Sequence, residues 1–163
     1  DLIIPVLVGQ SYGAIGKEVG LRMAYLIKDR IQFEWAKCNF DLTFPGPVVQ
    51  LLGDSGTGKT LFWHSLSGAS KELKSLSALK VIPVNYNLDE DTVVRMIQNE
   101  HKSLFVIDNA DIVITKTSSV DEIYKSDNQF ILMGRNPMLY RVPDNCIGFM
   151  EREGRRFTID YLE

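Results

Sequence analysis

The stretch from Val48 to Thr60 constrains this chain more than any other part of its sequence. An apolar run of strand length, residues 48–52, leads directly into the pattern Gly-x-x-x-x-Gly-Lys-Thr, which begins at Gly53. Glycines let the backbone turn tightly so that its N–H groups reach phosphate oxygens, and a following helix directs its positive end at the same anion. The pattern predicts a strand, a phosphate-binding loop and a helix, whereas the alternative is a glycine-rich turn with no ligand.

Two side chains of this loop have predicted chemical tasks. Lys59 supplies a point charge to the outer phosphates, and the Thr60 hydroxyl is a hard oxygen ligand for Mg²⁺. The residues expected to bind phosphate through the loop are Gly53, Asp54, Ser55, Gly56, Thr57, Gly58, Lys59 and Thr60.

A second informative stretch ends in an acid. Four apolar residues, 104–107, are followed by Asp108, and ligands of parallel sheets bind at the carboxyl ends of the strands. Asp108 is therefore expected to face Thr60 and to hold Mg²⁺ with it, directly or through water.

The composition is that of an ordinary soluble globular domain, with 163 residues of which 45% are apolar and 24% charged. A net charge of −3 gives no overall positive field for nucleic acid and leaves only a local patch as a way to bind it. Cys38 and Cys146 lack metal-ligand spacing, which favours a reduced, cytoplasmic location. No apolar run approaches the ~20 residues of a membrane span, and no signal peptide is expected.

Before the loop, hydrophobic residues alternate with polar ones. Residues 31–36 and 40–44 predict an antiparallel ribbon whose aromatic side chains belong to the core, with stacking on an adenine as the weaker alternative. Residues 1–30 contain a short apolar run at 2–8 and a glycine-containing turn, and they are not assigned further.

Beyond the loop, the pattern predicts further helices and strands. The helix after Thr60 is expected to end near Gly68. Asp89 or Asp91 begins the next helix, after a strand at 81–84, and a capping box from Ser119 to Glu122 predicts a short helix near 120–126. A buried strand at 129–134 and a terminal hairpin with its turn at 153–154 complete the chain.

The motifs at 53–60 and 104–108 resemble those of the P-loop nucleoside triphosphatases, over roughly residues 31–136. One strand and one helix lie between the two motifs, an order similar to the additional-strand branch with its AAA-type, RecA-type and ABC-type ATPases. The resemblance implies an α/β fold, namely a three-layer P-loop NTPase core with a mainly parallel sheet. To this core the sequence adds antiparallel β-hairpins at both ends, in one domain of residues 1–163 with its core at 31–136 and the terminal hairpin at 137–163.

The resemblance also implies roles for residues at the strand tips. ATP and Mg²⁺ are the expected cofactors, and Arg135 and Asn136 correspond to a sensor beside the γ-phosphate. In that branch an acid directly after Asp108 polarises the attacking water, but this chain has Asn109 there and Asp111 two positions on. The catalytic candidates are Lys59, Asn109, Asp111 and Arg135; Thr60 and Asp108 are the metal candidates, and Asn136 is a nucleotide-binding candidate.

These assignments predict a slow or partner-activated ATPase that takes an arginine from a second copy or a partner protein. A nucleotide-gated binding scaffold with little hydrolysis, or a small phosphotransferase, is the alternative. A GTPase fits less well, since the segment from Asp108 to Asp111 lacks the glycine of Asp-x-x-Gly.

Overall fold

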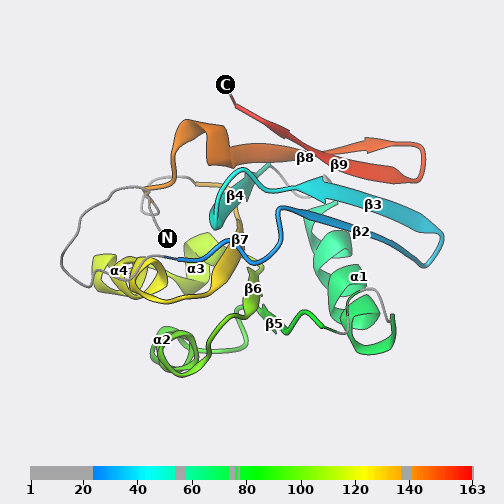
Figure 1. Cartoon of the computed structure of the whole chain (residues 1–163). Coiled ribbons are helices and arrows are strands. Elements are labelled where there is room, and N and C mark those ends of the chain that lie inside the picture. The colour runs from blue at the N-terminus through cyan, green and yellow to red at the C-terminus, as the bar shows by residue number, and fades with distance from the viewer. Residues whose placement is uncertain (1–23, 54–57, 74–75, 77, 137–140, 163) are drawn as a thin grey trace.

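The computed structural model describes residues 24–53, 58–73, 76, 78–136 and 141–162. These residues form an α/β structure with a mixed, curled sheet of eight strands and four α-helices (Figure 1), which confirms the α/β class expected from the sequence. The apolar run at 2–8 and the loop residues Asp54, Ser55, Gly56 and Thr57 lie outside the described residues.

The sheet joins the central strands and both hairpins into one surface. In spatial order its strands are β2 (Arg30–Trp35), β3 (Cys38–Thr43), β9 (Arg156–Tyr161), β8 (Ile147–Glu153), β4 (Val48–Leu52), β7 (Gln129–Met133), β6 (Leu104–Ile107) and β5 (Val81–Val84). The strands from β8 to β5 are parallel to one another, whereas β2–β3 and β8–β9 are antiparallel hairpins. Strand β7 therefore lies between β4 and β6.

Helices cover the two faces of the central strands. Helix α1 (Lys59–Glu72) packs on one face, where Val49 and Leu51 of β4 share a core with Phe62 and Leu66. On the other face Val48 shares a core with the helices α2 (Glu90–Asn99), α3 (Ala110–Val113) and α4 (Thr117–Lys125). Strands buried on both faces are nearly continuously apolar, and for this reason the runs at 48–52 and 104–107 were recognisable in the sequence.

The two hairpins lie side by side and form the part of the sheet beyond β4 (Figure 1), joined by a short parallel pairing of β3 with β9. Phe33, Phe40 and Phe157 form a stack across three strands, with 4.8 Å between the centroids of each neighbouring pair. Their exposed fractions are 6%, 1% and 0%, so none of the rings is open to stack on a base. The expectation that the aromatic residues of β2 and β3 belong to the core is confirmed for Phe33 and Phe40.

The predicted end of the first helix is wrong. Helix α1 runs through Gly68 to Glu72, and the N–H of Leu73 still donates to the Ala69 carbonyl. Gly68 serves packing instead, because a Cβ atom there would lie 3.0 Å from the ring of Trp35.

The predicted capping box is also wrong, although the helix itself exists. Helix α4 begins at Thr117, and the Ser119 hydroxyl donates to Glu90 Oε2 at 2.6 Å instead of capping its own helix. Glu90 also accepts the backbone N–H groups of Thr115 and Lys116 at 3.0 Å, so a residue of α2 holds the segment that leads into α4. The Asp89 alternative for the start of α2 is confirmed, since its side chain accepts the N–H of Thr92 at 2.7 Å.

In the described part of the chain, no helix is both long and apolar enough to cross a membrane.

Candidate functional site

The first and last described glycines of the loop have backbone conformations that favour glycine. Gly53, directly after β4, has φ of 138°, and Gly58, the N-cap of α1, has φ of 99°. Residues with a Cβ atom rarely adopt such φ angles, so the backbone conformation favours glycine at both positions. The carboxyl end of β4 and the first turn of α1 thus frame the place at which the sequence predicts a phosphate.

Lys59 lies between these two ends. Its Nζ atom donates to the Gly53 carbonyl at 2.6 Å, and the residue is only 9% exposed. The contact holds an ammonium group at the N-terminus of α1, where the unpaired N–H groups of the helix already favour an anion.

Thr60 and Asp108 come together as the sequence predicts. The Thr60 hydroxyl donates to Asp108 Oδ2 at 3.4 Å, which joins the first turn of α1 to the carboxyl end of β6. Asp108 is 7% exposed, and its other oxygen, Oδ1, accepts the N–H of Asn109 at 3.0 Å. The pair combines a hydroxyl and a carboxylate, which are both hard oxygen donors.

The indole of Trp63 helps to hold Thr60 beside Asp108. Its Nε1–H donates at 3.0 Å to the carbonyls of both Val84 and Val106, near the carboxyl ends of β5 and β6. Trp63 lies one helical turn after Thr60, so the bond anchors the start of α1 at the tips of these strands. Trp63 falls within the helix that the sequence predicts after Thr60, but nothing in the sequence indicates this contact.

The Thr60–Asp108 pair could supply two of the ligands of a Mg²⁺ ion. Adjacent ligands of octahedral Mg²⁺ are roughly 2.9 Å apart, because each metal–oxygen bond is about 2.1 Å long. The 3.4 Å between the two oxygens is close to this separation. Among the described residues, no cluster of three or more His, Cys, Asp or Glu side chains could hold a metal, so phosphate oxygens and water would have to supply the remaining ligands.

The tip of β7 is tied to the helix that follows β6. Asp111 in α3 accepts the backbone N–H of Arg135 through Oδ2 at 3.2 Å. A Cβ atom on Gly134 would lie 2.8 Å from Asp111 Oδ1, so the close contact depends on glycine at this position. Two of the catalytic candidates, Asp111 and Arg135, are therefore in direct contact.

The remaining candidates at this edge are Asn109 and Asn136. Asn109 has φ of 51° and precedes α3 as its N-cap, a left-handed conformation that Asn tolerates better than most residues. Asn136 is exposed, and its carbonyl accepts the Nε2–H of Gln50 at 2.9 Å.

Gln50 was missed from the sequence, although a polar residue inside a buried apolar strand is a recognisable signal. Its side chain is 0% exposed, and its Oε1 atom has no hydrogen-bond partner within the described structure. A buried amide costs stability unless it is bonded, so the single bond to Asn136 links β4 to the segment after β7 at some energetic expense.

On the other side of β4, the β8–β9 hairpin contacts the start of α1. A Cβ atom on Gly58 would lie 2.9 Å from Phe157 and 3.7 Å from Met150. The hairpin thus borders the candidate site, which sequence spacing alone did not indicate.

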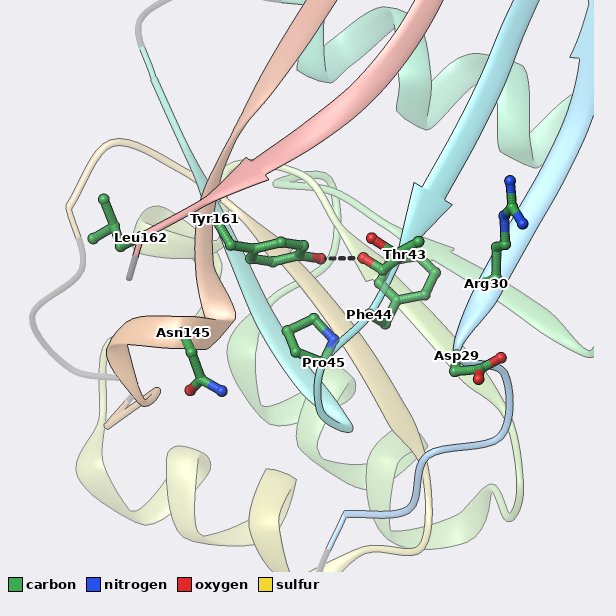
Figure 2. A pocket seen from close by; sticks show the side chains of 8 residues that line it. All are labelled: Asp29, Arg30, Thr43, Phe44, Pro45, Asn145, Tyr161 and Leu162. Carbon is green, nitrogen blue, oxygen red and sulfur yellow. Dashed lines mark hydrogen bonds between the residues drawn. The ribbon is translucent and has the colours of Figure 1, made fainter.

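A separate cavity of about 670 Å³ opens at the end of the sheet where β4 and β8 begin, away from the strand tips described above. Figure 2 shows Thr43, Pro45, Asn145 and Tyr161 around it, and the Tyr161 hydroxyl donates to the Thr43 carbonyl. These residues lie before β4 and β8 or at the end of β9, whereas the loop follows β4. The cavity is therefore distinct from the predicted phosphate site.

The sequence has no match among models of known protein families, and a search of curated proteins finds none similar to it. Any functional conclusion therefore rests on the residues and their geometry.

Proposed function

We propose that this chain binds ATP with Mg²⁺ at the carboxyl edge of β4 and β6 and is a slow or partner-activated ATPase of the P-loop type. The observation that carries the proposal is the contact between Thr60 and Asp108. These residues are 48 positions apart, and their oxygens lie 3.4 Å apart, with Lys59 held against Gly53 in the adjacent turn.

The strand order supports the same proposal. Strand β7 is inserted between the strand that precedes the loop and the strand that ends in Asp108. The additional-strand branch takes its name from an intervening strand of this kind. The two motifs resemble those of the same branch. A fold alone does not define an activity, so the proposal depends on the side chains at the strand tips.

The residues would divide the work of binding and hydrolysis. Lys59 and the N-terminus of α1 stabilise the negative charge of the phosphates, and that charge grows on the leaving group during transfer. Thr60 and Asp108 hold Mg²⁺, which supplies Lewis acidity to the outer phosphates. Asn109 and the Asp111–Arg135 pair lie at the tips of β6 and β7, and there they can orient the attacking water and sense the γ-phosphate.

One arrangement favours a nucleotide-gated scaffold as the second candidate. The residue directly after Asp108 is an amide, and the carboxylate of Asp111 already accepts the N–H of Arg135. Asn109 is not a carboxylate, and one oxygen of Asp111 is already bonded, so we expect bound ATP to persist. A second copy or a partner that supplies an arginine is then the expected activator, and ATP-dependent ordering of the strand-tip segments is the expected signal.

Thermal melting with and without ATP and Mg²⁺ tests nucleotide binding. ATP at about 100 times its Kd stabilises a protein by ~2.7 kcal/mol, which corresponds to a rise of roughly 5–10 °C in Tm for a chain of this size. Lys59→Ala should lose this rise. Lys71→Ala, which removes an exposed lysine from the last turn of the same helix, should keep it.

An equal rise in wild type and Lys59→Ala would show that ATP binds elsewhere, and no rise in wild type would refute ATP binding. Tm without ATP must also be compared between wild type and Lys59→Ala, because Lys59 is buried and bonded to Gly53 and its loss can itself lower stability.

A further inference from the structure

A row of four neighbouring side chains, three stacked rings and one arginine, crosses the two hairpins. Phe33, Phe40 and Phe157 stack as described, and Arg152 extends the row on β8, with its guanidinium carbon 5.2 Å from the centre of the Phe157 ring. Each member is the direct register partner of the next across β2, β3, β9 and β8. Arg152 is exposed, so it forms the open end of an otherwise buried row.

The open end of the row lies beside the candidate site. Phe157, on which Arg152 rests, is the residue that a Cβ atom on Gly58 would touch at 2.9 Å. Met150, two residues before Arg152 and on the same face of β8, also borders Gly58. Arg152 therefore faces the same side of the sheet as the first turn of α1.

Strand β8 also extends past β4. The last register pair between them joins Leu52 to Phe149, whereas β8 continues to Glu153. Arg152 lies in this extension, beyond the end of β4 and on the hairpin side of Gly53. Figure 1 shows the β8–β9 hairpin on the side of β4 opposite to β7, β6 and β5.

The Thr60–Asp108 pair defines which end of a nucleotide faces the hairpin. Asp108 lies at the tip of β6, on the β7 side of β4. A Mg²⁺ ion at this pair binds the outer phosphates. The nucleoside, at the other end of the phosphate chain, can then reach the side of β4 on which β8 and β9 lie.

We propose that Arg152 is the nucleoside-binding residue of this site and that the base stacks on its guanidinium plane, continuing the row of Phe33, Phe40 and Phe157. This inference rests on the proposed function. A guanidinium is planar and stacks on aromatic faces, and Nε of Arg152 is already fixed by a 2.8 Å bond to the Gly154 carbonyl. Stacking depends little on base identity, so the site should bind ATP and GTP with similar affinity.

Calorimetric titration with two probes, ATP–Mg²⁺ and inorganic tripolyphosphate–Mg²⁺, tests the inference. Arg152→Ala should weaken ATP binding by about 10- to 100-fold, the usual effect of losing one base-stacking side chain. It should leave tripolyphosphate binding within about twofold of wild type, since that probe has no base. Arg152→Lys should not restore ATP binding, because an ammonium group has the charge but not the plane.

Arg155→Ala is the matched control, because it removes the same charge from an exposed position in the turn of the same hairpin and should change neither affinity. Equal ATP affinity in wild type and Arg152→Ala would overturn the role of Arg152 while leaving the ATP site intact. Equal losses for both probes, with rescue by lysine, would also overturn it and show a phosphate contact instead. Wild type that binds neither probe would refute the proposed function itself.

Discussion

The carboxylate of Asp111 accepts the backbone N–H of Arg135, with 3.2 Å between Oδ2 and the nitrogen. This bond ties α3, which follows the Asp108 strand, to the tip of β7, where a γ-phosphate sensor is expected. In the proposed site Asp111 can therefore act through the position of Arg135, in addition to the direct contact with water that its sequence position suggested.

Substitutions at Asp111 separate these two roles. Asp111→Asn keeps an oxygen that can accept the N–H of Arg135, whereas Asp111→Ala removes it. If Asp111 acts by positioning, the ATPase rate should fall at least about 10-fold in Asp111→Ala and stay within about threefold of wild type in Asp111→Asn. Comparable losses in both variants, with unchanged Tm, would instead indicate that the carboxylate itself takes part in the reaction.

Asp108→Asn should weaken the dependence of ATP binding on Mg²⁺. An amide oxygen is a poorer ligand for a hard cation than a carboxylate, although it can still accept the hydroxyl of Thr60. Titration of ATP with Mg²⁺ and with EDTA measures the ratio of the two affinities, which should shrink by about 10-fold in the variant. An unchanged ratio would identify Asp108 as an ordinary residue at the end of a strand.

Asp41 links the two hairpins and gives a prediction for the pH dependence of stability. Two hydrogen bonds from Arg30, followed by one from Arg156, hold the pKa of Asp41 at about 2, below its ordinary 3.8. Because the folded pKa is lowered, the contribution of Asp41 is fully present above the unfolded pKa of 3.8 and is lost as pH falls through about 2.

Asp41→Asn should accordingly lower the free energy of unfolding by ~1 kcal/mol at neutral pH. This value is smaller than the pKa shift alone would give, because solvent screens the interaction of Asp41 with the two arginines. Urea unfolding at several pH values should show the difference from wild type shrinking between 3.8 and about 2. Asp160→Asn, at an exposed position of β9, serves as the control. A difference that does not change with pH would mean that the carboxylate charge contributes nothing.

The central strands were predictable because parallel strands covered on both faces are nearly continuously apolar, and polar caps such as Asp89 mark where a helix begins. The Thr60–Asp108 contact was predictable for a related reason. The carboxyl ends of parallel strands meet at one edge of the sheet, so an acid after one apolar run is expected near the loop that follows another.

The errors arose where distant contacts decided the local structure. Gly68 looks like a helix end, but it makes room for Trp35, and the Ser119 hydroxyl bonds Glu90 instead of its own helix. The contact between the β8–β9 hairpin and Gly58 depends on the parallel pairing of β8 with β4, which covers only three residue pairs and has no sequence signal. Arg152 could be recognised as a candidate only once this pairing placed it beside the loop.

Because Asn109 follows Asp108, we expect the wild-type protein to hydrolyse ATP slowly. A carboxylate can orient the attacking water and accept its proton, whereas an amide oxygen can orient the water but is a much weaker base. Acid–base assistance is typically worth ~10²–10⁴-fold, so its absence should leave turnover well below the usual range of ~1–10³ per second.

Asn109→Asp is the substitution that tests this explanation with the least disturbance. Asn109 has φ of 51°, and Asp tolerates this left-handed conformation, whereas Asn109→Glu would add backbone strain. If position 109 faces the γ-phosphate, Asn109→Asp should raise the rate of phosphate release, and Asn109→Ala should not. Fast unaided turnover by wild type, or an Asn109→Asp rate equal to that of wild type, would show that the attacking water is positioned by other residues.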